Sequence, residues 1–174
     1  RSHIARAGAA LIVVSNTSPL TNLAAIGQFQ LLHRLYEAVH IPNAVWDELN
    51  AQGQAWPGRD EVAAAPWVVR HVAGHQTLVT ALMADLDRGE AESIALALEL
   101  GAELMLLDEK EGRHAAQRLG LRVLGVAGVL LEAKAKGALK AVRPQLDALR
   151  QIAGFYIGEP LYQAVLALAG EEAS

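Results

Sequence analysis

Short apolar runs alternate along the chain with segments in which apolar residues recur every three or four positions. The runs predict strands, at Leu11–Val14, Val39–Ile41, Trp67–Val72, Leu104–Leu107 and Arg122–Leu124. The periodic segments predict helices, at Pro19–Ile26, 29–35, 42–49, Gln76–Ala84, Gly89–Leu100, Gly112–Leu119, Val129–Lys136, Pro144–Ile152 and Pro160–Leu168. Ser18 is expected to cap the first of these helices, and Ala51–Arg59 to form a loop. Strands that alternate with helices predict an α/β fold, in which a mostly parallel sheet is covered on both faces.

The length and composition predict one independently folding domain. The 174 residues, 52% of them hydrophobic, are enough for a full core, and we expect the domain to span 11–170. The first residues, Arg1-Ser2-His3, lack a starting Met, so residues 1–10 are expected to be a cloning remnant or a flexible N-terminal segment. No apolar run is long enough to cross a bilayer.

Cysteine and charge narrow the range of functions. The absence of cysteine excludes disulfides, thiolate zinc sites and cysteine nucleophiles, and it fits a cytoplasmic protein. The formal net charge of -4 argues against a broad basic surface for nucleic acid. A local basic rim around an acidic centre is still compatible with that charge.

Two predicted strands end in side chains with metal-binding oxygens. Ser15 and Asn16 follow the first strand, and Asp108 directly follows the fourth. In open parallel sheets, ligands bind outside the carboxyl ends of the strands, so these side chains are expected at one edge. Each also has an ordinary explanation, because Asp108 can cap a helix and Asn16 can bond its own backbone in a turn.

Two helices add further acids. Glu90 shares a helical row with Ile94 and is expected to face the core, where it needs the helix dipole or a metal as a partner. Glu92 and Glu99 lie on another row and are expected to face solvent. In the helix after Pro42, Glu48 lies beside the apolar stripe and is the acid expected to point inward or to the edge of that stripe.

Oxygen donors without thiolates favour Mg²⁺ or Mn²⁺. Such ions activate water and neutralise the charge on a phosphate under attack. No glycine-rich phosphate loop follows Leu11–Val14 and no P-loop lysine motif is present, which argues against a Rossmann-type enzyme acting on a small phosphorylated ligand.

Four segments together carry a family resemblance. They are Asn16-Thr-Ser-Pro-Leu, Ile41-Pro-Asn-Ala-Val-Trp-Asp-Glu48-Leu, Asp87-Arg-Gly-Glu90-Ala-Glu-Ser-Ile and Leu106-Leu-Asp108-Glu-Lys-Glu-Gly-Arg. In this order the chain resembles the PIN-domain nucleases, and within them a bacterial and archaeal subfamily of nucleic-acid-binding proteins related to VapC-type toxins. The resemblance runs from about residue 12 to residue 168.

The resemblance implies a Rossmann-like three-layer α/β/α sandwich that uses Mg²⁺ or Mn²⁺ to hydrolyse single-stranded or structured RNA. Its catalytic and metal-binding positions fall on four residues here, namely Asn16, Glu48, Glu90 and Asp108. Accessory roles fall on Ser18, Glu109 and Glu111, and nucleic-acid contacts on Lys110 and Arg113. Toxin members of the family are homodimers inhibited by a small antitoxin, so these partners are also implied.

One position departs from the family pattern, which has Asp where this chain has Asn16. A neutral amide still offers an oxygen, so a weakened metal site is expected. The alternative is a catalytically silent PIN-like module that binds nucleic acid or a protein partner. Trp46, Trp56 and Trp67 could be core residues, interface residues or base-stacking platforms, and the sequence leaves this open.

Overall fold

The computed structural model describes residues 11–172, so the prediction for residues 1–10 lies outside the described part of the chain. The strands are β1 (Val13–Ser15), β2 (Val39–Pro42), β3 (Val68–His71), β4 (Leu104–Leu106) and β5 (Val123–Leu124). The helices are α2 (Thr17–Ala25), α3 (Leu31–Tyr36), α4 (Asn43–Leu49), α5 (Arg59–Ala64), α6 (Gln76–Leu82), α7 (Arg88–Leu100), α8 (Lys110–Arg118), α9 (Val126–Ala135), α10 (Arg143–Gln151) and α11 (Glu159–Leu168).

All five strands belong to one parallel sheet with the order β3-β2-β1-β4-β5. The predicted α/β fold with a central parallel sheet is therefore confirmed. The chain winds outward from β1 in both directions, and β1 pairs with β4 so that Ser15 lies opposite Leu106. The crevice at such a reversal of strand order is where open α/β sheets bind ligands. Asn16 and Asp108 follow β1 and β4 at this place.

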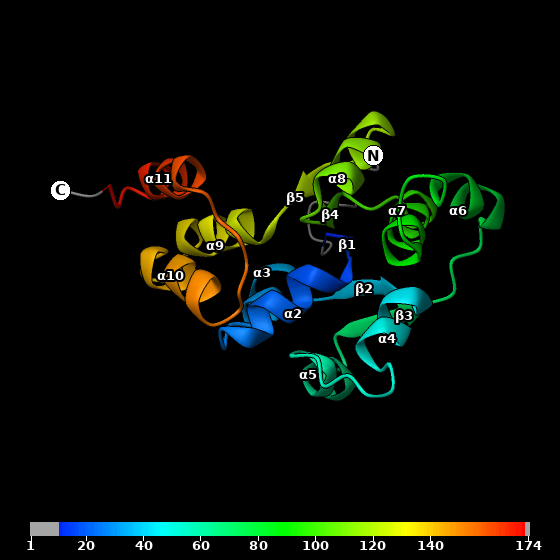
Figure 1. Cartoon of the computed structure of the whole chain (residues 1–174), viewed down its shortest axis with the longest axis horizontal. Helices are drawn as coiled ribbons and strands as arrows, with labels where there is room; N and C mark the ends of the chain where they lie inside the picture. The colour runs from blue at the N-terminus through cyan, green and yellow to red at the C-terminus, as the bar shows by residue number, and fades with distance from the viewer. Residues whose placement is uncertain (1–10, 173–174) are drawn as a thin grey trace, which may run out of the picture.

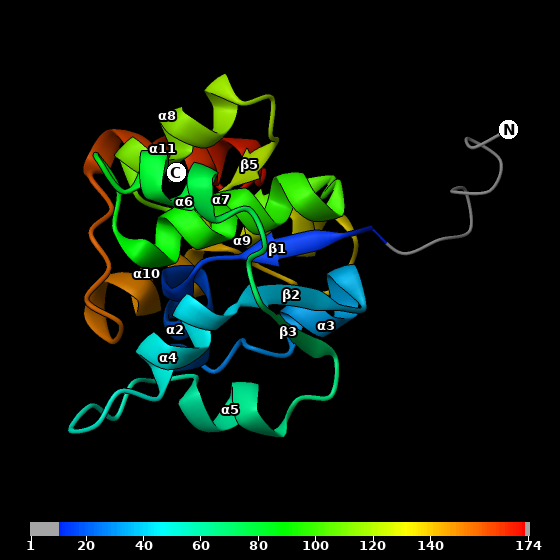
Figure 2. The same ribbon diagram turned by 90° about the vertical axis from the view of Figure 1, so that its right-hand side faces the viewer.

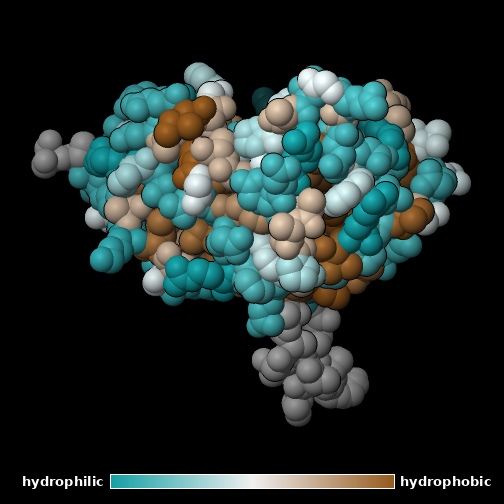
Figure 3. Space-filling view, turned by 90° about the horizontal axis from the view of Figure 1, so that it is seen from below, coloured by the Kyte–Doolittle hydropathy of each residue, from teal (hydrophilic) through white to brown (hydrophobic). Residues whose placement is uncertain are grey.

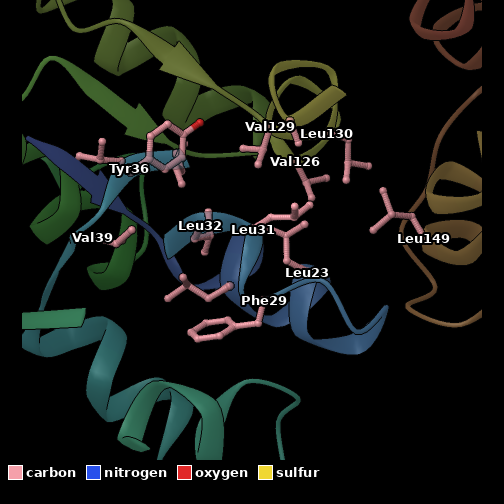
Figure 4. Packing of buried hydrophobic residues seen from close by; sticks show 14 of the residues in the cluster. Leu23, Phe29, Leu31, Leu32, Tyr36, Val39, Val126, Val129, Leu130 and Leu149 are labelled. Atoms are coloured by element: carbon pink, nitrogen blue, oxygen red, sulfur yellow. The ribbon is translucent and has the colours of Figure 1, made fainter. Parts of the chain in front are cut away.

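The sheet is buried on both faces, which explains its continuous apolar strands. Val13 and Leu106 point to one core, while their neighbours Val14 and Met105 point to the other. Helices α2, α3 and α9 cover the first face, and α7 and α8 cover the second, with α6 packed on α7 (Figures 1 and 2). Figure 4 shows side chains of α2, α3 and α9 filling the first core.

The start of α2 differs from the prediction. The helix begins at Thr17 with Asn16 at the N-cap position, and neither Asn16 nor Ser18 makes a capping hydrogen bond. The prediction that Ser18 caps this helix is wrong, because Ser18 lies inside the first turn. Pro19 is accommodated there because the first helical N–H groups have no intrahelical acceptor.

Helix α5 was not predicted at all. It lies just beyond the predicted loop, and Val62 is its buried residue. A single buried side chain gives no apolar periodicity to detect. Asp60 and Glu61 in its first turn favour the helix electrostatically instead.

The surface carries no extended apolar band in the view of Figure 3, where polar residues predominate and apolar ones form small patches between them. Among the helices of residues 11–172, none has both the length and the apolar character that a membrane span requires.

Candidate functional site

A hollow opens at the carboxyl ends of β1 and β4, where the strand order reverses. It is lined by residues from α2, the end of α4, the loop after α4, and the starts of α7 and α8, namely Asn16, Thr17, Ser18, Thr21, Glu48, Trp56, Asp87 and Glu109. Helices α2 and α4 directly follow β1 and β2 and lie at this edge of the sheet (Figure 2).

Asn16 lies at the floor of this hollow. Its backbone N–H donates to the Leu106 carbonyl at 3.0 Å, which ties the residue to β4. Its side chain is 5% exposed, and its Nδ2 donates to Glu109 Oε1 at 3.4 Å. Its Oδ1 is buried and has no hydrogen-bond partner. A buried acceptor without a donor is costly, so this oxygen is suited to a ligand that supplies positive charge or a donor.

Oxygens from three elements surround one point beside Gly89. A Cβ atom on Gly89 would stand 3.2 Å from Asn16 Oδ1, 3.4 Å from Glu48 Oε1 and 3.5 Å from Asp87 Oδ1. Thr17 Oγ1 donates to Glu48 Oε1 at 2.6 Å and so holds that carboxylate toward α2. The missing side chain of Gly89 keeps the space between these oxygens open.

Asp87 is a site residue that the sequence reasoning missed. It is the N-cap of α7, where its side chain accepts from the Glu90 N–H at 2.8 Å. The signal was present, because an Asp three positions before a Glu at the start of an apolar periodic segment is typical of a capping box.

Glu90 is buried in the first turn of α7, as expected. Its Oε1 accepts from the Asp87 N–H at 3.2 Å, so its side chain completes the capping box. Burial raises the pKa of Glu90, and the charges of Asp87, Glu109 and Glu48 raise it further against the backbone hydrogen bond. The helix start therefore supplies one partner for Glu90, and the raised pKa reflects its burial first and the nearby like charges second.

Asp108 lies on the other side of the crevice, between α2 and α9. Its Oδ1 accepts from the Val126 N–H at 2.9 Å, and its Oδ2 accepts from Ser18 Oγ at 3.4 Å. Burial is the main reason that the pKa of Asp108 is raised to about 6. The charge of Glu109 adds to this effect, while the Val126 N–H, Arg113 and Ser18 oppose it. Asp108 thus bonds to the first residue of α9, rather than capping the helix that follows it in sequence.

The other residues predicted around Asp108 lie in three different places. Glu109 lines the hollow and accepts from Asn16. Glu111 points elsewhere and lines a separate hollow with Asp85 and Arg118. Lys110 and Arg113 are exposed on α8 beside Glu109.

Glu92 corrects an expectation. It was expected to face solvent but is 6% exposed. Its Oε1 accepts from the Ala44 N–H at the start of α4 at 3.0 Å, and its Oε2 pairs with Arg88 Nε at 3.0 Å. Arg88 also pairs with Asp47 of α4 at 3.4 Å. These contacts join α7 to α4, the helix that carries Glu48.

The donors around Gly89 fit a hard divalent cation by their chemistry, because all are oxygens and the Asn16 oxygen lacks a partner. These oxygens do not form a closed coordination site. Within residues 11–172, no group of three or more acidic or histidine side chains is arranged to hold a metal ion. The edge is therefore an open acidic hollow.

Comparison with known proteins identifies the fold family. A family model described as a PIN domain matches residues 12–171, a range that contains the whole sheet and every residue of the hollow. No curated protein matches the chain.

Proposed function

The chain belongs to the PIN-domain family, and from that premise we propose that it is a divalent-metal-dependent ribonuclease whose metal site is weakened by Asn16. The observation that carries the proposal is the partnerless, buried Oδ1 of Asn16, which faces the carboxylate oxygens of Glu48 and Asp87 across the space beside Gly89. A bound cation would give this oxygen its missing partner and offset the repulsion between the carboxylates.

Mg²⁺ or Mn²⁺ would be held by Asn16, Glu48 and Asp87, with Glu90, Asp108 and Glu109 close by. When bound, such an ion activates water and neutralises charge on the phosphate. Thr17 orients Glu48 through its 2.6 Å hydrogen bond, and Ser18 orients Asp108. The pKa of Asp108, about 6, lies close to neutral pH, which suits a group that accepts or releases a proton.

A second candidate function, binding without cleavage, is favoured by the amide nitrogen of Asn16. Asn16 Nδ2 donates to Glu109, so one carboxylate of the hollow is already satisfied without a cation. A PIN-like module that binds nucleic acid or a partner protein without cutting would need no cation in the hollow. The two candidates differ in whether the hollow gains a cation.

The wider biological role follows the family resemblance. On that basis we extend the proposal to a place in the VapC-related subfamily, to RNA as the substrate, and to a toxin role with a homodimer and a small antitoxin partner. Lys110 and Arg113, exposed beside Glu109, are the groups we expect to contact the RNA backbone.

The test is cleavage of a mixed RNA pool by purified protein in Mn²⁺, Mg²⁺ or EDTA. The wild type should cut only with a metal, and Asp108→Asn should lose at least about 100-fold in rate, the usual scale for an acid–base group. Asn16→Asp should cut faster, since a third charge around Gly89 binds the cation more tightly. Glu111→Gln is the matched control and should cut like the wild type, because Glu111 lines another hollow.

If the wild type and Asn16→Asp are both inert in every metal, the nuclease proposal fails for these substrates. Binding of the same RNA without cutting would then support the second candidate.

A further inference from the structure

The three tryptophans of the chain have different surroundings. Trp67 stacks on His33 with ring centroids 5.0 Å apart and also meets Phe29. Trp46 has the Arg70 guanidinium 4.9 Å above its ring. Both pack against the core. Within residues 11–172, no aromatic ring or cation lies against Trp56, which is 40% exposed.

Trp56 stands at the acidic hollow. It lines the same depression as Asn16, Glu48 and Asp87, although it lies in the loop after α4 and far from two of them in sequence. Its large apolar ring therefore borders the oxygens that the proposed function uses. Trp56 is 40% exposed, so its ring contributes little to folding, because much of its surface stays in contact with water.

The backbone around Trp56 is anchored, so the ring is held near the hollow. The Trp56 carbonyl accepts from the Arg59 N–H at 3.2 Å, at the start of α5. Gly58 adopts a positive φ of 94°, and a Cβ there would lie 3.4 Å from Leu20 O and 3.4 Å from Ala24 Cβ of α2. The loop is thus pressed against α2, the helix that begins at the site. Holding a ring in place lowers the entropy lost when a ligand stacks on it.

We propose that Trp56 is a stacking platform for an unpaired nucleobase beside the phosphate at the acidic hollow. This inference rests on the proposed function for the identity of the ligand as RNA. A free indole face suits a base, because every base has a π-face and stacking needs no sequence-specific hydrogen bond. A base inside a duplex already stacks on its neighbours and does not offer that face. Trp56 is therefore a positioning residue that favours RNA with an unpaired base at the cleavage site.

The proposal is tested by binding, apart from cleavage. A protein with Trp46→Phe and Trp67→Phe keeps Trp56 as its single tryptophan and reports directly on that ring. We expect a single-stranded 12-nucleotide oligoadenylate to quench its fluorescence saturably in Ca²⁺, a hard cation that takes the same oxygen ligands. A self-complementary RNA duplex of equal length should quench it much less.

The second test measures the affinity of the protein for the oligoadenylate. In the otherwise unchanged protein, Trp56→Ala should weaken binding of the oligoadenylate by about 5- to 150-fold, the factor that corresponds to ~1–3 kcal/mol of stacking per base. Trp56→Phe should keep most of the affinity, which a merely structural role of this loop would not explain. Trp46→Phe is the matched control and should bind like the wild type. Trp56→Ala and Trp56→Phe should unfold at temperatures close to that of the wild type, since Trp56 is exposed.

Unchanged affinity in Trp56→Ala, or an oligoadenylate that fails to quench the Trp56-only protein, would overturn the inference. The two proposals fail separately. Quenching and weakened binding without any metal-dependent cleavage would leave Trp56 as a stacking residue of a silent module. If cleavage occurs but does not change in Trp56→Ala, the nuclease proposal stands and the stacking role of Trp56 is wrong.

Discussion

Asp108 is a side chain whose charge the fold does not fully stabilise. Its carboxylate is partly buried and lies near the like charge of Glu109, and together these effects raise its pKa to about 6. The hydrogen bonds from Val126 and Ser18 offset only part of that effect. Because the ionised form is disfavoured in the folded state, the charge of Asp108 destabilises the protein at neutral pH.

Asp108→Asn should therefore stabilise the metal-free protein. The pKa of Asp108 is 3.8 in the unfolded chain and about 6 in the folded protein, so the folded protein holds this proton more tightly. The stability due to this proton is fully present below pH 3.8, and it is lost as the pH rises through about 6. The gain in unfolding free energy of the variant should thus grow between about pH 4 and pH 6 and reach up to ~3 kcal/mol above that range.

Urea unfolding in EDTA at pH 4.5 and pH 7.5 measures this gain. Asparagine keeps an oxygen for the Val126 N–H, so the start of α9 is preserved. Glu111→Gln, an exposed change on the next helix, should alter stability by less than about 0.5 kcal/mol at either pH. An equal gain for Asp108→Asn at both pH values would contradict the burial of its charge.

At the scale of elements, α4 depends on a residue from another helix. Its N-cap is Pro42, whose side chain cannot accept a hydrogen bond, and the Ala44 N–H is satisfied by Glu92 of α7. The same carboxylate pairs with Arg88. Glu92 therefore fixes the position of the helix that brings Glu48 to the hollow.

Glu92→Ala should lower the unfolding free energy by about 1–3 kcal/mol, because it leaves the buried Ala44 N–H without a partner. Thermal and urea unfolding measure the loss. Glu99→Ala is the matched control in the same helix, since Glu99 also accepts from a backbone N–H, that of Gly74 at 3.0 Å, but at an exposed place. Its effect should be no more than about 0.5 kcal/mol. Equal effects of the two changes would mean that the cap from α7 is unimportant.

Two elements, β4 and α7, show what could be predicted from the sequence. The apolar run at β4 and the periodicity of α7 are local signals, and both elements were predicted within two residues of their observed ends. Glu90 is buried as expected, but every residue from 89 to 97 of α7 is buried too, so its helical row did not distinguish it. Glu92 could not be placed correctly, because its burial depends on the packing of α4 against α7, which no local pattern encodes. The wrong cap at Ser18 arose because α2 starts before its proline.

At the scale of the whole molecule, the parallel sheet concentrates negative charge at one edge. The chain has a formal net charge of only -4, yet the charges of three acids, Glu48, Asp87 and Glu109, all act on Glu90 at the reversal of strand order. Such an edge repels the RNA backbone unless a cation is present. The fold therefore makes the proposed metal and the proposed substrate depend on each other.

A metal that binds only the folded protein must raise its melting temperature, by an amount that depends on affinity. For a site with a Kd of about 1 mM, 10 mM Mn²⁺ adds ~1.4 kcal/mol, which corresponds to a rise of roughly 3–6 °C for a domain of this size.

Asn16→Asp should melt lower than the wild type in EDTA, because it adds a buried charge beside Glu109. It should gain more from Mn²⁺, since the added carboxylate binds the cation. Scanning fluorimetry of both proteins and of Glu111→Gln, with and without Mn²⁺, measures the two effects. No shift in the wild type and Asn16→Asp alike would show that the oxygens around Gly89 do not bind the ion.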